Sequence, residues 1–157
     1  MATVALRSVR DSDLDAIFEQ MRDPASVHMA AFTATDPDDR AAFDAHMNRI
    51  RSSPDCLLRV VTIGDDVVGT VGSFVADGTT EVTYWITRSW WGGGVASRAL
   101  ELLLLEVSVR PLRARVASDN AASLRVLATA GFERVGTESG YASARGTVIE
   151  EAILELT

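Results

Sequence analysis

The stretch of residues 81–117 restricts the possible folds of this chain more than any other part of its sequence. Residues 81–87 are rich in Val, Thr, Tyr, Trp and Ile, which is typical of a strand, and residues 112–117 predict a second strand. Between them lie three consecutive glycines, residues 92–94, and an amphipathic helix predicted over residues 95–109. A strand, a helix and a strand in this order predict two parallel strands joined by a right-handed crossover.

The segments around this unit predict a mixed sheet with antiparallel hairpins. Before it we expect an edge strand at residues 3–8 and two helices, at residues 12–23 and 36–50. A hairpin of two strands, at residues 57–63 and 67–76, follows them. Residues 25–35 have a sparse pattern and are expected to be irregular. After it we expect a helix to residue 130 and strands at residues 133–137 and 147–156. The order β-α-α-β-β-β-α-β-α-β-β in 157 residues fits a single domain, 1–157.

Composition and charge disfavour several classes of partner. The net charge is −7, whereas nucleic-acid binding needs a basic surface, so we expect no nucleic-acid partner. An acidic surface suits cationic partners such as amines, or serves solubility alone. The longest strongly apolar run is residues 102–105, and the first residues lack a signal-peptide pattern, so we expect no membrane contact and a cytoplasmic location. Cys56 is the only cysteine, which excludes an internal disulfide, and no cluster has metal-ligand spacing, so we expect no metal.

The three glycines stand where a strand ends and a helix begins, which is a typical site for binding a phosphate. The first amides of a helix have no partner within the helix and lie at the positive end of its dipole. A P-loop would require a Lys-Ser or Lys-Thr pair, and neither occurs. The dinucleotide fingerprint G-x-G-x-x-G/A is matched in part by Gly92 and Gly94, with Asp119 after the next strand as the acidic residue. Against it, Ser97 stands at the last position of the fingerprint, and too little chain remains for two nucleotide-binding halves.

Three motifs resemble the GNAT acetyltransferase superfamily. Residues 91–96, Trp-Gly-Gly-Gly-Val-Ala, resemble its acetyl-CoA loop Q/R-x-x-G-x-G/A, with Trp91 where Gln or Arg is usual. Residues 81–86 and residues 120–132, with Asn-Ala-Ala-Ser and Gly-Phe, resemble its ribosomal-protein N-terminal acetyltransferase (RimJ/RimL-like) branch. The resemblance covers nearly the whole chain. It implies an α/β acyl-CoA N-acyltransferase fold with a mixed, mostly antiparallel sheet of about seven strands, a splayed parallel pair, and helices on both faces.

The resemblance also implies acetyl-CoA as co-substrate. The pantetheine would pair with main-chain groups that the splay leaves free near Ile86 and Arg88, like an added strand. The pyrophosphate would rest on the amides of the glycine loop, and Asn120 would hold the pantetheine from the other side. The residues expected to bind acetyl-CoA are Ile86, Thr87, Arg88, Trp91, Gly92, Gly93, Gly94, Val95, Ala96, Ser97 and Asn120.

The reaction implied is a direct attack of a primary amine on the thioester in a ternary complex. Glu81 is expected to take a proton from the ammonium, which has no lone pair, through a water molecule. The alternative interpretation of Glu81 is a solvated carboxylate at the start of a strand, without a catalytic role. A main-chain N–H near Ile86 or Thr87 would bind the oxyanion. The tyrosine that many members use as the acid corresponds to Leu127, so Ser123 is expected to take that role, with an ordinary first-turn helix residue as the alternative.

The acceptor is expected to be a protein N-terminus or a small amine that enters from the side opposite CoA. Residues 25–35 and 138–145 would form this side, with His28, Phe32 and Tyr141 contacting the acceptor; the alternative for the two aromatic residues is a place in the core. We expect a monomer or a homodimer. Two other functions are open: a CoA-binding module without catalysis, and a nicotinamide-dinucleotide-binding protein.

Overall fold

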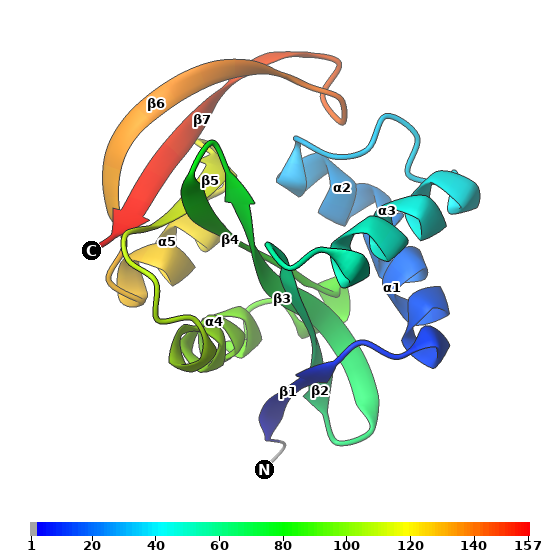
Figure 1. The fold of residues 1–157 in the computed structure, drawn as a ribbon. Helices are drawn as coiled ribbons and strands as arrows, with labels where there is room; N and C mark the ends of the chain where they lie inside the picture. Colours follow the sequence, from blue (N-terminus) through cyan, green and yellow to red (C-terminus); the bar gives the residue numbers. More distant parts are fainter. Residues whose placement is uncertain (1–2) are drawn as a thin grey trace.

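One seven-stranded sheet forms the centre of the protein in a computed structural model that describes residues 3–157 (Figure 1). Its strand order is β1-β2-β3-β4-β5-β7-β6, and every neighbouring pair is antiparallel except β4 and β5. The strands are β1 (Val4–Ser8), β2 (Leu57–Ile63), β3 (Asp66–Ala76), β4 (Thr79–Ile86), β5 (Leu112–Ala117), β6 (Glu133–Ala142) and β7 (Thr147–Leu156). The predicted mixed, mostly antiparallel sheet with one parallel pair is confirmed.

Helices cover both faces of this sheet (Figure 1). On one face lie α1 (Leu14–Met21), α2 (Pro24–Ala30) and α3 (Arg40–Ser52), and on the other lie α4 (Val95–Glu106) and α5 (Ala121–Thr129). Two short 3₁₀ turns, η1 (Asp11–Asp13) and η2 (Arg88–Trp90), precede α1 and follow β4. None of the helices within residues 3–157 is long and apolar enough to cross a membrane.

Alternation along β4 determines which side chains each helical layer meets. Val82, Tyr84 and Ile86 pack with the apolar core beneath α4, where Leu100 and Leu103 are fully buried. Because successive side chains of a strand point to opposite faces, Glu81, Thr83 and Trp85 face the layer of α1 to α3. The Trp85 indole confirms this direction, since its N–H donates to the carbonyl of Gln20 in α1 at 3.2 Å.

The parallel pair β4–β5 is joined only at its beginning. Thr80 pairs with Leu112 and Glu81 pairs with Arg113, and no later residues of the two strands pair. Beyond these two pairs β4 continues to Ile86 and β5 to Ala117. The two strands therefore splay apart toward their carboxyl ends, as predicted, and we refer to this gap as the splay.

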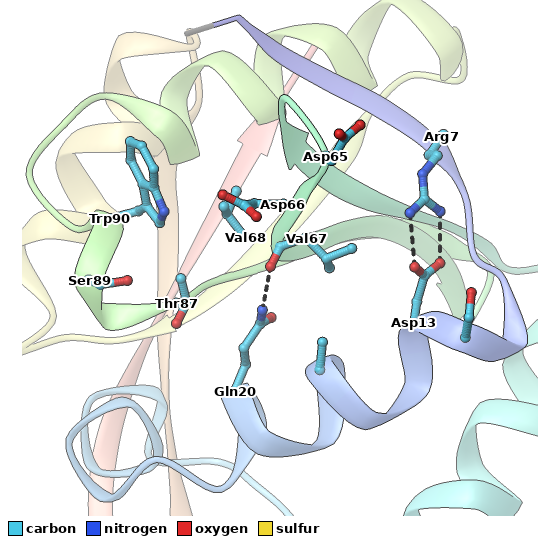
Figure 2. Close-up of a pocket in the computed structure, with 12 residues that line it drawn as sticks. Arg7, Asp13, Gln20, Asp65, Asp66, Val67, Val68, Thr87, Ser89 and Trp90 are labelled. Atoms are coloured by element: carbon cyan, nitrogen blue, oxygen red, sulfur yellow. Dashed lines mark hydrogen bonds and ion pairs between the residues drawn. The ribbon is translucent and has the colours of Figure 1, made fainter.

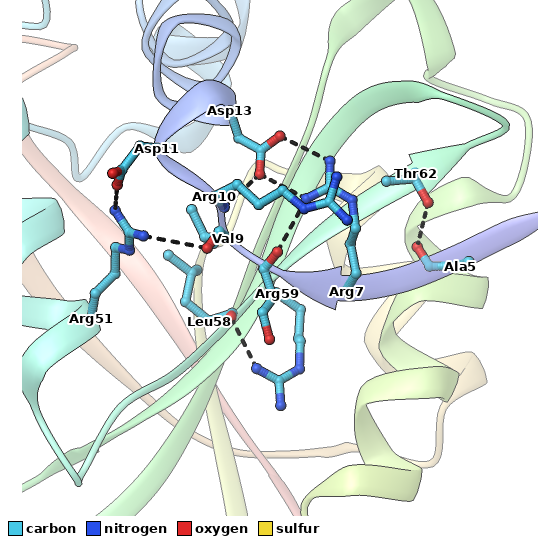
Figure 3. Close-up of polar contacts among 11 residues, drawn as sticks. Ala5, Arg7, Val9, Arg10, Asp11, Asp13, Arg51, Leu58, Arg59 and Thr62 are labelled. Carbon is cyan, nitrogen blue, oxygen red and sulfur yellow. Dashed lines mark hydrogen bonds and ion pairs between the residues drawn. The ribbon is translucent and has the colours of Figure 1, made fainter.

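A buried ion pair fixes the start of α1 against β1 (Figure 3). Asp13 in η1 is 4% exposed and accepts two hydrogen bonds from the Arg7 guanidinium, at 2.8 and 2.9 Å. It also accepts one from the main-chain N–H of Arg10, at 2.7 Å. The guanidinium, more than any other group, lowers the pKa of Asp13 below its ordinary value. This pairing holds the N-terminal strand and the first helix together.

Several element boundaries differ from the sequence-based expectation. Residues 25–35 were expected to be irregular, but Pro24–Ala30 forms α2, capped by the Asp23 carboxylate, which accepts from the Ser26 N–H at 3.0 Å. Helix α4 ends at Glu106 instead of residue 109, and α3 begins at Arg40 instead of near residue 36. Strand β6 continues to Ala142 rather than ending at residue 137, because β7 pairs with it along its whole length.

Candidate active site

The glycine loop has the backbone shape that only glycine adopts easily. Gly92 and Gly94 both have φ of +78°, in the left-handed region, and Gly94 is the N-cap of α4. A Cβ at either position would meet no atom within 4 Å, so the loop faces open space. Arg98 is the first residue of the helix to donate to a helical carbonyl, that of Gly94, at 3.1 Å. The amides of residues 95–97 therefore have no acceptor within α4 and are available to an anion.

The end of β4 turns the main-chain groups of Ile86 toward the splay. Thr87 donates its N–H to the Val68 carbonyl in β3 at 2.8 Å, so Thr87 is not the free donor that the sequence allowed. Peptide groups of successive residues in a strand point to opposite edges, so the N–H and carbonyl of Ile86 point away from β3 into the splay. The Ile86 carbonyl already accepts from the Trp91 indole at 2.8 Å. The Ile86 carbonyl therefore has a partner, and the Ile86 N–H is the group that this residue offers as a donor toward the splay.

Two hydroxyl groups meet between β4 and the start of α5. The Tyr84 hydroxyl lies 2.5 Å from Ser123 Oγ and 3.3 Å from the Ser123 carbonyl oxygen. Asn120 is the N-cap of α5, and its Oδ1 accepts from the Ser123 N–H at 3.1 Å. Leu127, which the GNAT resemblance places at the position of a tyrosine, is buried in the core. Burial raises the pKa of Tyr84, and the hydrogen bond with Ser123 partly offsets the rise.

Glu81 belongs to a charged cluster on the opposite face of the sheet. Its side chain is 8% exposed, and Oε2 lies 3.5 Å from Arg115 Nε. The same guanidinium donates to Glu138 at 2.8 Å and lies 3.5 Å from Glu151. Burial raises the pKa of Glu151, and Arg115 partly offsets this rise. Three carboxylates around one guanidinium leave an excess of negative charge, and we call these four residues the Arg115 cluster.

The two segments expected to receive the acceptor lie side by side. The Ala144 N–H donates to the Ala31 carbonyl at 3.1 Å, and Arg145 Nε donates to the His28 carbonyl at 2.7 Å. Phe32 is partly buried and packs with a cluster of small residues, Ala31, Ala117 and Ala142, together with Ile149. Tyr141, in contrast, is 64% exposed. The structure thus separates the two aromatic residues, which the sequence treated alike.

A shallow cleft of about 620 Å³ lies beside η2, outside the splay (Figure 2). Helix α1 and the β2–β3 hairpin form its other walls, and the Gln20 side-chain amide crosses it to donate to the Val67 carbonyl at 2.8 Å. Neither Glu81 nor Ser123 lines it. Within residues 3–157, no three His, Cys, Asp or Glu side chains lie close enough together to hold a metal ion.

Comparison with known proteins identifies the family. Residues 3–133 match the family model described as an acetyltransferase (GNAT) domain. The chain belongs to the GNAT acetyltransferase family. This GNAT assignment overturns the dinucleotide-binding alternative, and the carboxylate of Asp119, which that alternative needed, is bound to Arg145 at 2.7 and 3.2 Å.

Individual relatives agree with the GNAT assignment. The chain is 29% identical over 104 residues to p20, an uncharacterized N-acetyltransferase of Bacillus licheniformis; the match covers 62% of this chain and spans 58% of that protein's length. RimJ of Mycobacterium smegmatis, solved in complex with CoA-disulfide, has a TM-score of 0.83 at 24% identity, covering 98% of this chain and 81% of that one. Spermidine N-acetyltransferase of Vibrio cholerae, in complex with CoA and spermine, has a TM-score of 0.81 at 16% identity, covering 98% and 94%. At these identities the structures show a shared fold, and RimJ represents the branch that the motifs resemble.

Proposed function

We propose that this chain is an acetyl-CoA-dependent N-acetyltransferase that acetylates a primary amine. The observation that carries the proposal is the arrangement of polar groups on the two sides of the splay. Glu81 lies on the face of α1 to α3, whereas Tyr84 and Ser123 lie on the face of α4 and α5. An amine and a thioester can therefore meet through the splay from opposite sides, with a base on one side and hydroxyl donors on the other.

The glycine loop has the properties that acetyl-CoA requires. A pyrophosphate is an anion, and the free amides of residues 95–97 stand at the positive end of α4. Gly92 and Gly94 keep the approach open, and the Ile86 N–H suits a carbonyl of the pantetheine or of the thioester. Bound acetyl-CoA would supply an acetyl thioester with a thiolate leaving group. The remaining contacts predicted for it, at Thr87, Arg88, Trp91, Gly93 and Asn120, belong to the same proposal.

Glu81 is the proposed base. An ammonium has no lone pair, so one of its protons must leave before nitrogen can attack a carbonyl carbon. The Glu81 carboxylate is almost buried, and its contact with Arg115 Nε, at 3.5 Å, is looser than the 2.8 Å bond of the same guanidinium to Glu138. Arg115 therefore leaves the Glu81 carboxylate without a short hydrogen bond from its guanidinium. Such a carboxylate is able to accept a proton from the amine, directly or through water.

The Arg115 cluster favours an acceptor that carries more than one positive charge. Its carboxylates come from β4, β6 and β7, and only one guanidinium balances them. The chain as a whole carries a net charge of −7, which attracts cations to its surface. The similar Vibrio cholerae spermidine N-acetyltransferase was solved with spermine, a polyamine, whereas the motif resemblance favours a protein N-terminus. We therefore propose a polyamine-like small amine as the acceptor, with His28 and Tyr141 at the edge of its path.

An acceptor comparison with a free-thiol readout tests the proposal. Acetyl-CoA is supplied with 1,4-diaminobutane, with n-butylamine, which has the same chain but one charge, or with a short peptide bearing a free N-terminus. We expect the diamine to give the highest kcat/KM, with an advantage over butylamine that falls as salt is added. A preference for the peptide would contradict the acceptor class but not acetyl transfer. Binding of CoA without thiol release for any amine would identify a CoA-binding module without catalysis.

A further inference from the structure

The departing thiolate of this reaction needs a proton, and the usual source is absent. Leu127 stands where many family members have a tyrosine, and it is 1% exposed within the core. The sequence points only to Ser123 as a replacement. An aliphatic alcohol is a much weaker acid than a phenol, so a lone serine that gave up its proton would become a high-energy alkoxide. The site therefore needs a second group that returns a proton to Ser123.

Tyr84 is positioned to be that group. It lies on β4, 39 residues before Ser123, and its hydroxyl approaches Ser123 Oγ to 2.5 Å. Ser123 is the third residue of α5, after the N-cap Asn120. Its Oγ lies in the first turn of the helix, where the dipole favours negative charge as it develops. Tyr84 is partly buried against the core beneath α4, and burial raises its pKa, which favours the protonated phenol.

We propose that Tyr84 and Ser123 form a two-hydroxyl relay that delivers a proton to the sulfur of the leaving thiolate. Ser123 is the catalytic residue that touches the sulfur, and Tyr84 is a positioning residue that acts through it. This inference rests on the proposed acetyltransferase function. In the relay, Tyr84 donates to Ser123 Oγ, which leaves the hydroxyl proton of Ser123 directed toward the ligand.

The relay balances in protons and electrons. The amine nitrogen forms a bond to the carbonyl carbon, and the C–S bond breaks with its electron pair on sulfur. Sulfur takes the proton of Ser123 Oγ, and Oγ takes the proton of Tyr84, which becomes a phenolate and is then reprotonated by water. The ammonium nitrogen loses two protons through Glu81 to water. One proton is therefore released to solvent for each acetyl group transferred, and no oxidant or reductant is involved.

A structural role is the competing explanation, because the same hydrogen bond also ties β4 to α5. The two explanations differ in their dependence on the leaving group. A relay matters for a thiolate that needs a proton, but not for 4-nitrophenyl acetate, whose nitrophenolate leaves unprotonated. A purely structural contact would affect the enzyme-dependent transfer from both donors equally.

The experiment uses Tyr84→Phe, Ser123→Ala and the double variant, with Ser108→Ala as a control that removes an exposed hydroxyl just after α4. For each, kcat, the KM for acetyl-CoA and the melting temperature are measured. We expect Tyr84→Phe to lower kcat with acetyl-CoA by ~10-fold and Ser123→Ala by ~10- to ~100-fold, with an unchanged KM. The double variant should be no slower than Ser123→Ala alone, since both residues serve one proton. In these variants the rate of transfer from 4-nitrophenyl acetate should equal that of the parent. The Ser108→Ala control should match the parent with both donors.

Three results would overturn the relay. The first is an active parent chain with undiminished turnover in Tyr84→Phe. The second is an equal loss with both donors, and the third is a double variant in which the two losses multiply. An inactive parent chain in the acceptor comparison would instead overturn the proposed function, and the relay with it. If Tyr84→Phe lowers the melting temperature strongly, the ratio of the rates with the two donors, measured on the same preparation, still separates a proton-transfer defect from a folding defect.

Discussion

Arg145, in the turn between β6 and β7, holds both carboxylate oxygens of Asp119, at 2.7 and 3.2 Å. The same guanidinium donates to the carbonyl of His28, at the end of α2. One side chain therefore ties together the segment after β5, the last turn of α2 and the β6–β7 turn. The last two belong to the segments, residues 25–35 and 138–145, that are expected to border the acceptor. Because Asp119 is exposed, the pair contributes little stability, and its effect is to restrict how these segments move relative to one another.

The first prediction separates the two aromatic residues of this region. Phe32→Ala removes a ring that packs on Ala31, Ala117 and Ala142, so we expect a loss of about 2 kcal/mol in the free energy of unfolding. Tyr141→Ala removes an exposed ring and should leave stability unchanged while raising the acceptor KM. Urea denaturation and acceptor kinetics on both variants check this. A lower CoA affinity with an unchanged acceptor KM would place Tyr141 elsewhere in the mechanism.

The second prediction concerns the glycine loop. Gly94→Asp should abolish acetyl-CoA binding, because its carboxylate would repel the pyrophosphate. Gly78→Asp is a matched control: Gly78 has φ of +77°, close to the +78° of Gly94, and also faces open space, but it lies in the β3–β4 turn. Both variants should lose about 1 kcal/mol of stability from the backbone strain. Calorimetric titration with CoA should detect binding only in the control, and equal affinities would refute the loop assignment.

The third prediction tests the base. Glu81→Gln should lower turnover, and the loss should shrink as the pH rises, because more of the amine is then unprotonated without help. Glu155→Gln is the control, since Glu155 pairs with Arg113 on the same face of the sheet but lies outside the Arg115 cluster. The measurement is kcat/KM for the acceptor across a pH series. A loss that is the same at every pH would show that Glu81 has a structural role only.

The fourth prediction follows from the buried pair of Arg7 and Asp13 (Figure 3). Because hydrogen bonding from Arg7 lowers the pKa of Asp13 in the folded state, the contribution of Asp13 to stability is fully present above the ordinary pKa of an aspartate. It is lost as the pH falls through the lower folded-state value. Asp13→Ala should cost about 3 kcal/mol near neutral pH by leaving the guanidinium without its partner. In acid the parent and the variant should converge in urea denaturation, and a constant difference between them would contradict this account.

The sequence predicted the fold well where a pattern is local and poorly where contacts are distant. The strand, glycine loop and helix of residues 81–106 follow from β-branched residues, three glycines and a leucine stripe, all close together in the chain. Helix α2 was missed because its seven residues, Pro24–Ala30, are too few to form a recognisable apolar stripe. The extension of β6, residues 138–142, was missed because Tyr141 is its only strong strand former. Pairing with β7 decides its structure.

The candidate site divides in the same way. The residues of the glycine loop could be named from a motif, because a phosphate needs adjacent amides on one short segment. The Tyr84–Ser123 contact could not, since 39 residues separate its partners and Tyr84 resembles an ordinary core aromatic in sequence. The same holds for the Arg115 cluster, because its four residues come from four different strands, β4 to β7. The pairing of Thr87 with Val68 also depends on strand register, which the sequence does not determine to one residue.

The splay also has a mechanical consequence. Within the sheet, only two residue pairs join strands β1–β4 to strands β5–β7. The described part of the sheet therefore consists of two halves with a short hinge at Thr80 and Glu81. A ligand that lies along the free edge of β4 and reaches α5 would connect the two parts of the sheet where main-chain pairing is absent. Ligand present at 100 times its dissociation constant adds about 2.7 kcal/mol to the free energy of unfolding. In this protein the increase in stability should appear as slower amide hydrogen exchange along the facing edges of β4 and β5. Catalysis would then take place in a protein that is more rigid than the ligand-free protein.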